Sequence, residues 1–374
     1  MLEGVERVVT KVRHGSSGHD NSDDAAGFLH EGPPGGAVNA LRTGPVSHTL
    51  RHPPHTHYAT GVIDLHTHST FSDGSDTPDQ LAQRAHELGL RAIALTDHDT
   101  TASHDEMARA CARVGVEHVV GVEVSLRDNE FPMVRDGRRL PRNVHVLAYF
   151  LPTDRDHPVQ RQLAALRHDR DVRNRELVAR LARLGFTKVT LEYLTAMTGN
   201  VESIGRPHFA RAMLELHPEI VGDISDAARN QIFVDWLGST GRAYIPKTSM
   251  PIEQFVDAAR ATPTVFAIAH PLVNYVDSLD HSEIESTMPR VMASLRERGF
   301  TGVEAYYGGT PAATRALMVK LTRDAGLVPT GGSDYHGYYK EDVALGFGRS
   351  GDLRVPDEIL PELRGAGLAK AAAV

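Results

Sequence analysis

Residues 62–96 read VIDLHTHSTFSDGSDTPDQLAQRAHELGLRAIALT and predict one strand–helix–strand unit. The apolar run 62–66 is typical of a buried strand. The stretch TPDQ at 77–80 predicts a helix start, because threonine caps the first turn, proline favours the first helical position and glutamine completes a capping box. The helix is expected to end near Gly89, and the apolar run 91–96 predicts the second strand.

The same alternation continues along the chain. Short apolar runs, nearly uninterrupted by polar residues, suit strands that are buried on both faces of a parallel sheet. Helical patterns lie between them, at about 103–114, 288–299 and 311–326. This alternation predicts an α/β fold, and seven units predict a closed or nearly closed barrel. The seven predicted strands are 62–66, 91–96, 119–124, 144–150, 265–270, 302–306 and 327–331.

One long interval breaks this rhythm. Between Phe150 and Val265 the sequence has no clear strand pattern, and we predict a mostly helical insertion at 153–250, after the fourth strand. Within 127–142, the pair Asp136-Gly137 predicts the turn of a hairpin. The helical patterns of this interval lie at about 156–184, 191–197, 207–216, 227–237 and 252–261.

These patterns divide the chain into five parts. Residues 1–58 contain GSSGHDNSDD, GPPGG and RHPPHTH, with little periodicity, and predict a disordered or poorly ordered extension. Its seven histidines are interpreted as solvated, although a metal-binding tail is an alternative. The remaining parts are 59–152 (barrel, first part), 153–250 (insertion), 251–350 (barrel, second part) and 351–374 (C-terminal tail).

The composition of the 374-residue chain limits the functional classes. Its net charge of −8 argues against binding to long duplex nucleic acid, although a local basic pocket stays compatible with it. The one cysteine, Cys111, excludes an internal disulfide framework and is expected to pack inside a helix. The chain lacks an apolar run of the roughly 20 residues that cross a bilayer, and its start lacks the apolar centre of a secretory signal. We therefore expect a cytoplasmic protein.

Histidines and carboxylates follow nearly every predicted strand, mostly at its C-terminal end. In parallel α/β barrels the catalytic residues gather at this end. Neutral imidazole and carboxylate ligands suit zinc, iron or manganese, and the lack of cysteine among them argues against a structural zinc site. Nine ligands exceed the needs of one ion and predict two or three divalent metals. The nine candidates are His66, His68, Asp73, His98, Glu123, His145, His270, Asp334 and His336.

Four ordered motifs resemble the PHP family, the polymerase-and-histidinol-phosphatase phosphoesterases. They are HTHSTFSDGSDTP from His66, ALTDHDT from Ala94, the pair GVEVS and NVHVLAYF, and the late AHP and GSDYH, together spanning about 62–347. The resemblance implies a distorted (β/α)7 barrel with three metals. One ion would be held by His66, His68, Glu123 and Asp334, a second by Glu123, His145 and His270, and a third by Asp73, His98 and His336.

The resemblance also implies a substrate class. Histidinol phosphatases and polymerase-associated members typically have histidine at the position of Asp73. The form found here is similar to the subgroup that acts on nucleotides, namely 3′,5′-nucleoside bisphosphate phosphatases and exonucleases that trim short RNA 5′ ends. In GRPHFA (205–210) and AYIPK (243–247), Arg206 and Lys247 are expected to clamp a phosphate. His208 would either bind phosphate or cap the insertion helix.

Four further residues have predicted supporting roles. Asp99 is expected to orient His98 and to belong to the catalytic group, and Glu304 to orient a metal ligand without being one. Tyr306 and Tyr307 would either line a base or sugar pocket or pack in the core.

The expected reaction is hydrolysis of a phosphomonoester of a small nucleotide, by attack of a hydroxide that bridges two metals. The alternatives are 5′–3′ cleavage of short RNA or DNA oligonucleotides, histidinol-phosphate hydrolysis, and a non-catalytic metal- or nucleotide-binding module. The sequence leaves the identity of the metals and the oligomeric state open.

Overall fold

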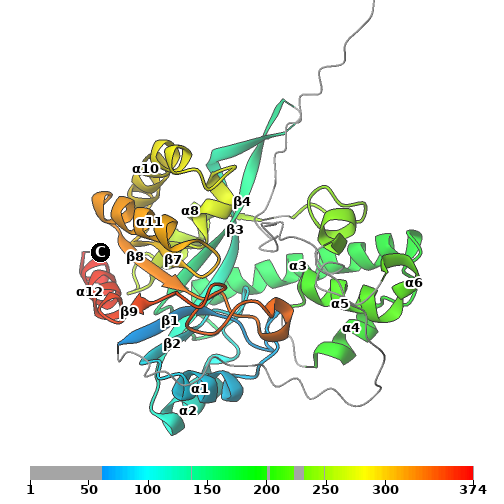
Figure 1. The fold of residues 1–374 in the computed structure, drawn as a ribbon, viewed down its shortest axis with the longest axis horizontal. Helices are drawn as coiled ribbons and strands as arrows, with labels where there is room; N and C mark the ends of the chain where they lie inside the picture. The colour runs from blue at the N-terminus through cyan, green and yellow to red at the C-terminus, as the bar shows by residue number, and fades with distance from the viewer. Residues whose placement is uncertain (1–60, 136, 200–202, 223–230, 248, 374) are drawn as a thin grey trace, which may run out of the picture.

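The first strand–helix–strand unit forms as predicted. In this computed structural model, which describes residues 61–135, 137–199, 203–222, 231–247 and 249–373, β1 (Val62–Thr67) pairs in parallel with β2 (Ala92–Leu95), and α1 (Pro78–Glu87) connects them (Figure 1). Thr77 caps α1, because its hydroxyl accepts from the Gln80 N–H at 3.3 Å and the Gln80 side chain accepts from the Thr77 N–H at 2.9 Å. The predicted extension 1–58 lies outside the described residues.

All seven predicted strands are present in one sheet. The order along this sheet is β8-β7-β6-β4-β3-β2-β1-β9, and the short β5 pairs with β3. The sheet closes where the segment after β8 meets β1: the Asp334 N–H donates to the His66 carbonyl at 2.9 Å, and the His68 N–H donates to the Tyr335 carbonyl at 3.0 Å. The remaining strands are β3 (Glu117–Arg135), β4 (Arg138–Tyr149), β5 (Met250–Pro251), β6 (Val265–Ile268), β7 (Gly302–Tyr307), β8 (Val328–Gly332) and β9 (Val355–Pro356).

The sheet is not wholly parallel, and in this respect the prediction was wrong. β3 and β4 form a long antiparallel hairpin that projects from the barrel, and β4 is also antiparallel to β6 (Figure 1). The connection between Arg135 and Arg138, which pair with each other, is too short for the crossover that parallel strands need. The hairpin therefore lies where Asp136-Gly137 predicted it, although Asp136 itself is outside the described residues.

Side-chain alternation along this hairpin separates the core from the site. Val122, Val124 and Leu126 of β3 belong to the apolar cluster between the sheet and its helices. The intervening Glu123 and Ser125 point to the opposite face, because successive side chains of a strand alternate. The cluster includes side chains from α8 (Ile252–Ala258), α9 (Pro271–Tyr275), α10 (His281–Glu297) and α11 (Ala312–Asp324).

The insertion is helical, as predicted, and has an apolar cluster of its own. α3 (Pro158–Arg183) joins it to the barrel: Val159 and Leu163 pack in the barrel cluster, whereas Leu177 and Leu181 pack in the insertion cluster. The predicted helix 227–237 is seen as a π-helical turn, η1 (Phe233–Leu237), with 223–230 outside the described residues. The other insertion helices are α4 (Leu191–Thr198), α5 (Arg206–Leu216) and α6 (Pro218–Val221).

The C-terminal residues, predicted as a tail from 351, contribute to the packed fold. β9 pairs antiparallel with β1, and Ile359, Leu360 and Leu363 of α12 (Ile359–Ala372) are buried. Cys111 is buried in α2 (His104–Val114), as predicted, and burial raises the pKa of its thiol to about 11. Among the described residues, no helix is both long and apolar enough to cross a membrane.

The buried His104, paired with the half-buried His118, predicts acid sensitivity of the fold. His104 Nε2 lies 2.7 Å from the Gly121 carbonyl, and its Nδ1 lies 3.2 Å from His118 Nε2. Burial lowers the pKa of His104 to about 4, below the value of about 6.5 for an unfolded chain. As the pH falls, the unfolded chain binds a proton at His104 at a higher pH than the folded chain does. His104 therefore contributes to folding stability above about pH 6.5, and this contribution is lost as the pH falls toward 4.

The variant His104→Gln keeps a donor for Gly121 but does not titrate. Between about pH 7.5 and about pH 5, we expect the wild type to lose about 2 kcal/mol more unfolding free energy than the variant does. Urea denaturation of both proteins at both pH values measures this difference, since all other histidines titrate in both. An equal loss in the two proteins would contradict the depressed pKa.

Candidate metal centre

The nine predicted ligands come together in the structure. They lie at the ends of β1, β2, β6 and β8, in the loops that follow, and within β3 and β4. All nine side chains are buried, and the most accessible, His98, has 9% of its surface exposed. Such a group of histidines and carboxylates has a high desolvation cost unless a cation or hydrogen bonds compensate it.

The first group comprises His66, His68, Glu123 and Asp334. Glu123 Oε2 lies 3.3 Å from His66 Nε2 and 3.1 Å from His68 Nε2, and Asp334 Oδ1 lies 3.5 Å from both nitrogens. A tetrahedral site with ligand bonds of about 2.0–2.1 Å has donor atoms about 3.3–3.4 Å apart. The four donor atoms therefore have the spacing that a divalent metal requires.

The second group uses the other oxygen of Glu123. Its Oε1 lies 2.9 Å from His145 Nδ1 and 3.0 Å from His270 Nε2. The two oxygens of one carboxylate thus face two different sets of histidines. This arrangement fits a carboxylate that bridges two cations.

The third group surrounds Asp73. Its Oδ1 lies 3.4 Å from His336 Nε2, and its Oδ2 lies 3.5 Å from His98 Nε2. His68 Nδ1 lies 3.6 Å from Asp73 Oδ1, so this group adjoins the first one. Asp73, His98 and His336, with His68, form one of the clusters in which all donor atoms lie within 4.8 Å of one another.

Several buried donor atoms of these groups have no hydrogen-bond partner among the described residues. They are the Nε2 atoms of His66 and His68, His98 Nδ1, His270 Nδ1 and Asp73 Oδ1. A buried polar atom without a partner costs about 1–3 kcal/mol. Divalent metals would satisfy these atoms, so the residues present fit the metals that the sequence predicts.

The electrostatics of the groups also favour a cation. Burial alone would raise the pKa of Glu123, but His145 and His66 outweigh it and hold the pKa well below its usual range. For Asp334, Lys340 and His66 likewise outweigh burial and lower the pKa. Burial lowers the pKa of His98 to about 4. The carboxylates are therefore anionic and His98 is neutral at pH 7, which are the forms that bind metals.

Three buried carboxylates hold the candidate ligands in place. Glu304 lies where predicted: its Oε1 is 2.7 Å from His66 Nδ1, and its Oε2 accepts from the His270 N–H at 2.6 Å. Asp97 accepts hydrogen bonds from the side chains of three serines, Ser69, Ser72 and Ser103. Asp64 accepts from the Ser333 N–H at 2.9 Å and the Gly346 N–H at 2.8 Å.

Sequence reasoning had assigned no role to Asp64 or Asp97. The spacing Asp-x-His-x-His in β1 is a signal for the first of them, since alternate residues of a strand share a face. Asp97 precedes His98 directly, and two of its three serine partners, Ser69 and Ser72, are distant in sequence. Because these partners are brought together only by the fold, the sequence has no local signal for the role of Asp97.

Tyrosine and lysine side chains contact the outer oxygen of Asp334. The Tyr307 hydroxyl donates to Asp334 Oδ2 at 3.0 Å, and Lys340 Nζ lies 2.6 Å from the same oxygen. Tyr307 is therefore a positioning residue for a candidate ligand. Tyr306 packs at the edge of an apolar cluster.

Backbone strain is concentrated at the same place. Among the described non-glycine residues, φ is positive at Asp99 (56°), His270 (29°) and Asp334 (60°), and also at Phe150. Such conformations cost roughly 1–3 kcal/mol each and persist only where the surrounding structure enforces them. Gly332 permits the close approach of β8 to β1, because a Cβ there would lie 2.4 Å from the His66 nitrogen.

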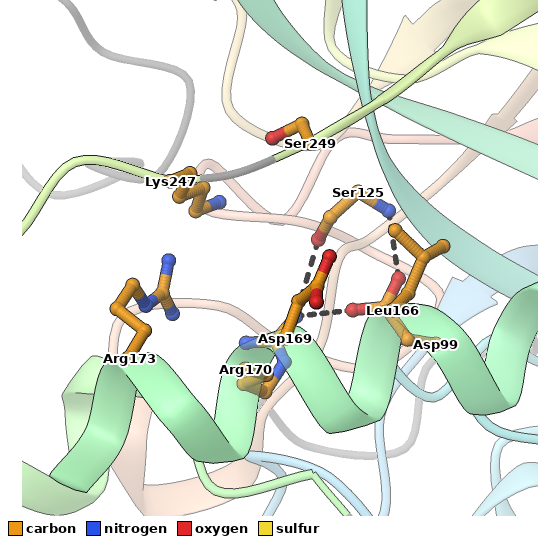
Figure 2. Close-up of a pocket in the computed structure, with 8 residues that line it drawn as sticks. All are labelled: Asp99, Ser125, Leu166, Asp169, Arg170, Arg173, Lys247 and Ser249. Atoms are coloured by element: carbon orange, nitrogen blue, oxygen red, sulfur yellow. Dashed lines mark hydrogen bonds and ion pairs between the residues drawn. The ribbon is translucent and has the colours of Figure 1, made fainter.

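A basic pocket adjoins the candidate metal centre. It is lined by Arg170 and Arg173 of α3 and by Lys247, and Figure 2 shows the last two pointing into the same space. Arg170 forms an ion pair with Asp99 and donates to the Ser125 hydroxyl at 3.1 Å. Lys247 is half-buried, and desolvation together with the charges of Arg173, Arg206 and Arg170 lowers its pKa well below the usual range.

The residues predicted to bind phosphate lie in or beside this pocket. Arg206 lines a neighbouring cavity that also contains Arg173 and Lys247, and it donates to the Leu237 carbonyl at 3.1 Å. His208 caps α5, since its Nδ1 accepts from the Gly205 N–H at 3.0 Å. Arg170 and Arg173 were not predicted, because a helical pattern alone does not show which face of α3 meets the barrel.

The carboxylate of Asp99 points toward this pocket. Its Oδ1 accepts from the Ser125 N–H at 2.8 Å, and its Oδ2 contacts Arg170. Asp99 thus connects the pocket to the metal centre, since the adjacent residue His98 is a candidate ligand. Its predicted role of orienting His98 stays a prediction.

Comparison with known proteins agrees with this geometry. Residues 64–235 match the model of the PHP domain. The chain is 27% identical to a 5′-3′ exoribonuclease of Haemophilus influenzae over 74% of its length and 90% of that protein. It is 29% identical to a phosphoribosyl 1,2-cyclic phosphate 1,2-diphosphodiesterase of Eggerthella lenta, over 76% of this chain and 98% of that one.

Two further proteins are similar. A 3′,5′-nucleoside bisphosphate phosphatase of Chromobacterium violaceum is 29% identical over 73% of this chain and 87% of that protein. A crystal structure from Bifidobacterium adolescentis, provisionally named a metal-dependent phosphoesterase, superposes with a TM-score of 0.65 at 27% identity. The superposition covers 83% of this chain and 97% of the Bifidobacterium adolescentis chain.

The contact between Glu304 and His66 predicts a loss of metal affinity on substitution. In Glu304→Gln only one of the two acceptor oxygens remains and its charge is lost, so either His66 Nδ1 or the His270 N–H loses its acceptor. We expect metal affinity to fall about 10- to 100-fold, as for other residues that orient metal ligands. Titration with a chelating competitor measures the affinity, and Glu297→Gln, an exposed carboxylate on α10, is the control. Equal affinities in the two variants would contradict the positioning role.

Proposed function

Since the chain belongs to the PHP family of metal-dependent phosphoesterases, we propose that its substrate is a phosphomonoester of a small nucleotide, such as a nucleoside 3′,5′-bisphosphate. The observation that carries this proposal is the basic pocket beside the candidate metal centre. A substrate with two phosphate groups would place one at the metals and the other in this pocket.

The charge balance of the pocket supports an anionic ligand. Four cationic side chains, Arg170, Arg173, Lys247 and the neighbouring Arg206, converge there. Two carboxylates line the pocket: Asp99, which is engaged by Arg170, and the exposed Asp169. Desolvation is the largest cause of the lowered pKa of Lys247, and repulsion from Arg173, Arg206 and Arg170 lowers it further. A phosphate dianion would relieve this repulsion and accept charge-assisted hydrogen bonds.

The residues of this chain divide the chemical work. The nine candidate ligands, with Glu123 between two groups, would hold the metals, which when bound polarise phosphoryl oxygens and lower the pKa of water. Arg206 and Lys247 bind and neutralise phosphate oxygens, Arg173 supplies a further cation, and Asp99 holds Arg170 toward the pocket. Burial of the nine candidate ligands and of Asp99 strengthens the electrostatic interactions at the metal centre.

A specific observation favours a second candidate, a short oligonucleotide cleaved from its 5′ end. Glu123, Ser125 and Arg127 alternate along β3, so they share one face that leads from the metal centre past the pocket. Arg127 would meet the phosphate of a following nucleotide, and the Haemophilus influenzae relative is named an exoribonuclease. Comparing kcat/KM for adenosine 3′,5′-bisphosphate and for a 5′-phosphorylated dinucleotide distinguishes the two substrates.

Histidinol phosphate is less favoured, because Asp73 occupies the position that is typically histidine in that subgroup.

Hydrolysis is expected to depend on the metals and on Glu123. After chelation and dialysis, activity should fall below about 1% of its starting value and return when a divalent metal is added. Glu123→Gln removes the charge shared by two ligand groups and should lose both bound metal and activity. Elemental analysis beside the phosphate-release assay tests this, and full activity in metal-free protein would contradict it.

The basic pocket is expected to set the affinity for the second phosphate. Arg173→Ala should raise KM for adenosine 3′,5′-bisphosphate about tenfold, since a charge-assisted hydrogen bond contributes about 1.5–3 kcal/mol. A nucleoside monophosphate that places its one phosphate at the metals should be affected less. Arg175→Ala, which removes the same charge from the exposed side of α3, is the control. If both variants change KM equally, the pocket does not bind the second phosphate.

A further inference from the structure

An aromatic pair lies directly beside the candidate metal centre. The short 3-10 helix η2 (Gly337–Lys340) follows the candidate ligand His336 and ends at Lys340, which contacts Asp334. Between these two anchors lie Tyr338 and Tyr339. Tyr338 is a large aromatic side chain with 47% of its surface exposed.

The two rings and an arginine hold one another in place. The ring centroids of Tyr338 and Tyr339 are 4.5 Å apart, and the Arg211 guanidinium lies 5.3 Å from the Tyr338 centroid. Arg211 also donates to both tyrosine hydroxyls and to Glu215, the last at 2.7 Å. The exposed ring is thus fixed in orientation before any ligand arrives.

This cluster lies where the insertion contacts the barrel. The Tyr339 ring lies 5.4 Å from the ring of His208 on α5, nearly perpendicular to it. Gly205, at the start of α5, approaches the metal centre so closely that a Cβ there would lie 3.3 Å from Asp73 Oδ2. The η2 tyrosines and the third ligand group therefore both lie against the start of α5.

We propose that Tyr338, braced by Tyr339 and Arg211, is the surface on which the nucleobase of the substrate stacks. The proposal rests on the proposed nucleotide function. Every base has a π face, and stacking on aromatic rings with a nearby arginine is the usual way that proteins bind bases without reading their sequence. The same cluster also connects η2 to α5, but a purely structural contact has no need of a ring that is half exposed.

The test compares two substrates in two variants. Tyr338→Leu keeps an apolar side chain but removes the ring, whereas Tyr338→Phe keeps the ring and removes the hydroxyl. The probes are adenosine 3′,5′-bisphosphate and its base-free analogue, 1-deoxyribose 3,5-bisphosphate. We expect Tyr338→Leu to raise KM for the nucleotide about tenfold with little change in kcat, because stacking contributes to binding rather than to the reaction. Tyr338→Phe should retain the nucleotide affinity.

The base-free substrate distinguishes stacking from a structural effect. If Tyr338→Leu raises KM equally for both substrates, or leaves both unchanged, the stacking proposal is overturned. Selective loss for the nucleotide, with the thermal unfolding midpoint and the base-free kcat/KM retained, supports it. If the wild type hydrolyses phosphomonoesters but no nucleotide, the proposed function fails first and the stacking proposal falls with it.

Discussion

The buried carboxylate of Glu123 is the constraint on which the rest of the site depends. Each of its oxygens serves a different set of histidines, at 2.9–3.3 Å. This position depends on the register of β3, in which Glu123 pairs with Leu147 and Ser125 with His145. A slip of one residue would turn Glu123 into the apolar cluster and bring Val124 into the site. The packing of β3 and the metal chemistry therefore select the same register.

The barrel keeps the ligands in place with charges that do not themselves bind metal. Asp64 contacts the backbone that follows β8, and Glu304 spans from His66 to the backbone of His270. The latter contact is made by the backbone of His270, where φ is positive, a conformation that an isolated segment would not keep. Closing the sheet between β1 and β8 and ordering the ligands are thus achieved by the same hydrogen bonds.

How much of this the sequence predicted depends on the range of each interaction. The strands, the cap at Thr77 and the ligand candidates were predictable, because apolar runs and the motifs around them are local. The direction of β4 was not, since buried apolar runs look alike in parallel and antiparallel strands. Arg170 and Tyr338 were missed for another reason: each gains its role only when the insertion packs against the barrel. The sequence contains no local signal for that contact.

The molecule separates its chemistry from its selectivity. The candidate metal ligands belong to the barrel, whereas Arg206 and Arg211 belong to the insertion, so substrate preference is able to change without altering the metals. The two parts still need a fixed relation, and α3 supplies it by packing in both apolar clusters. Arg170 of α3 pairs with the buried Asp99, next to His98. Because breaking a buried ion pair is costly, this contact holds the basic pocket at a constant position from the metal centre.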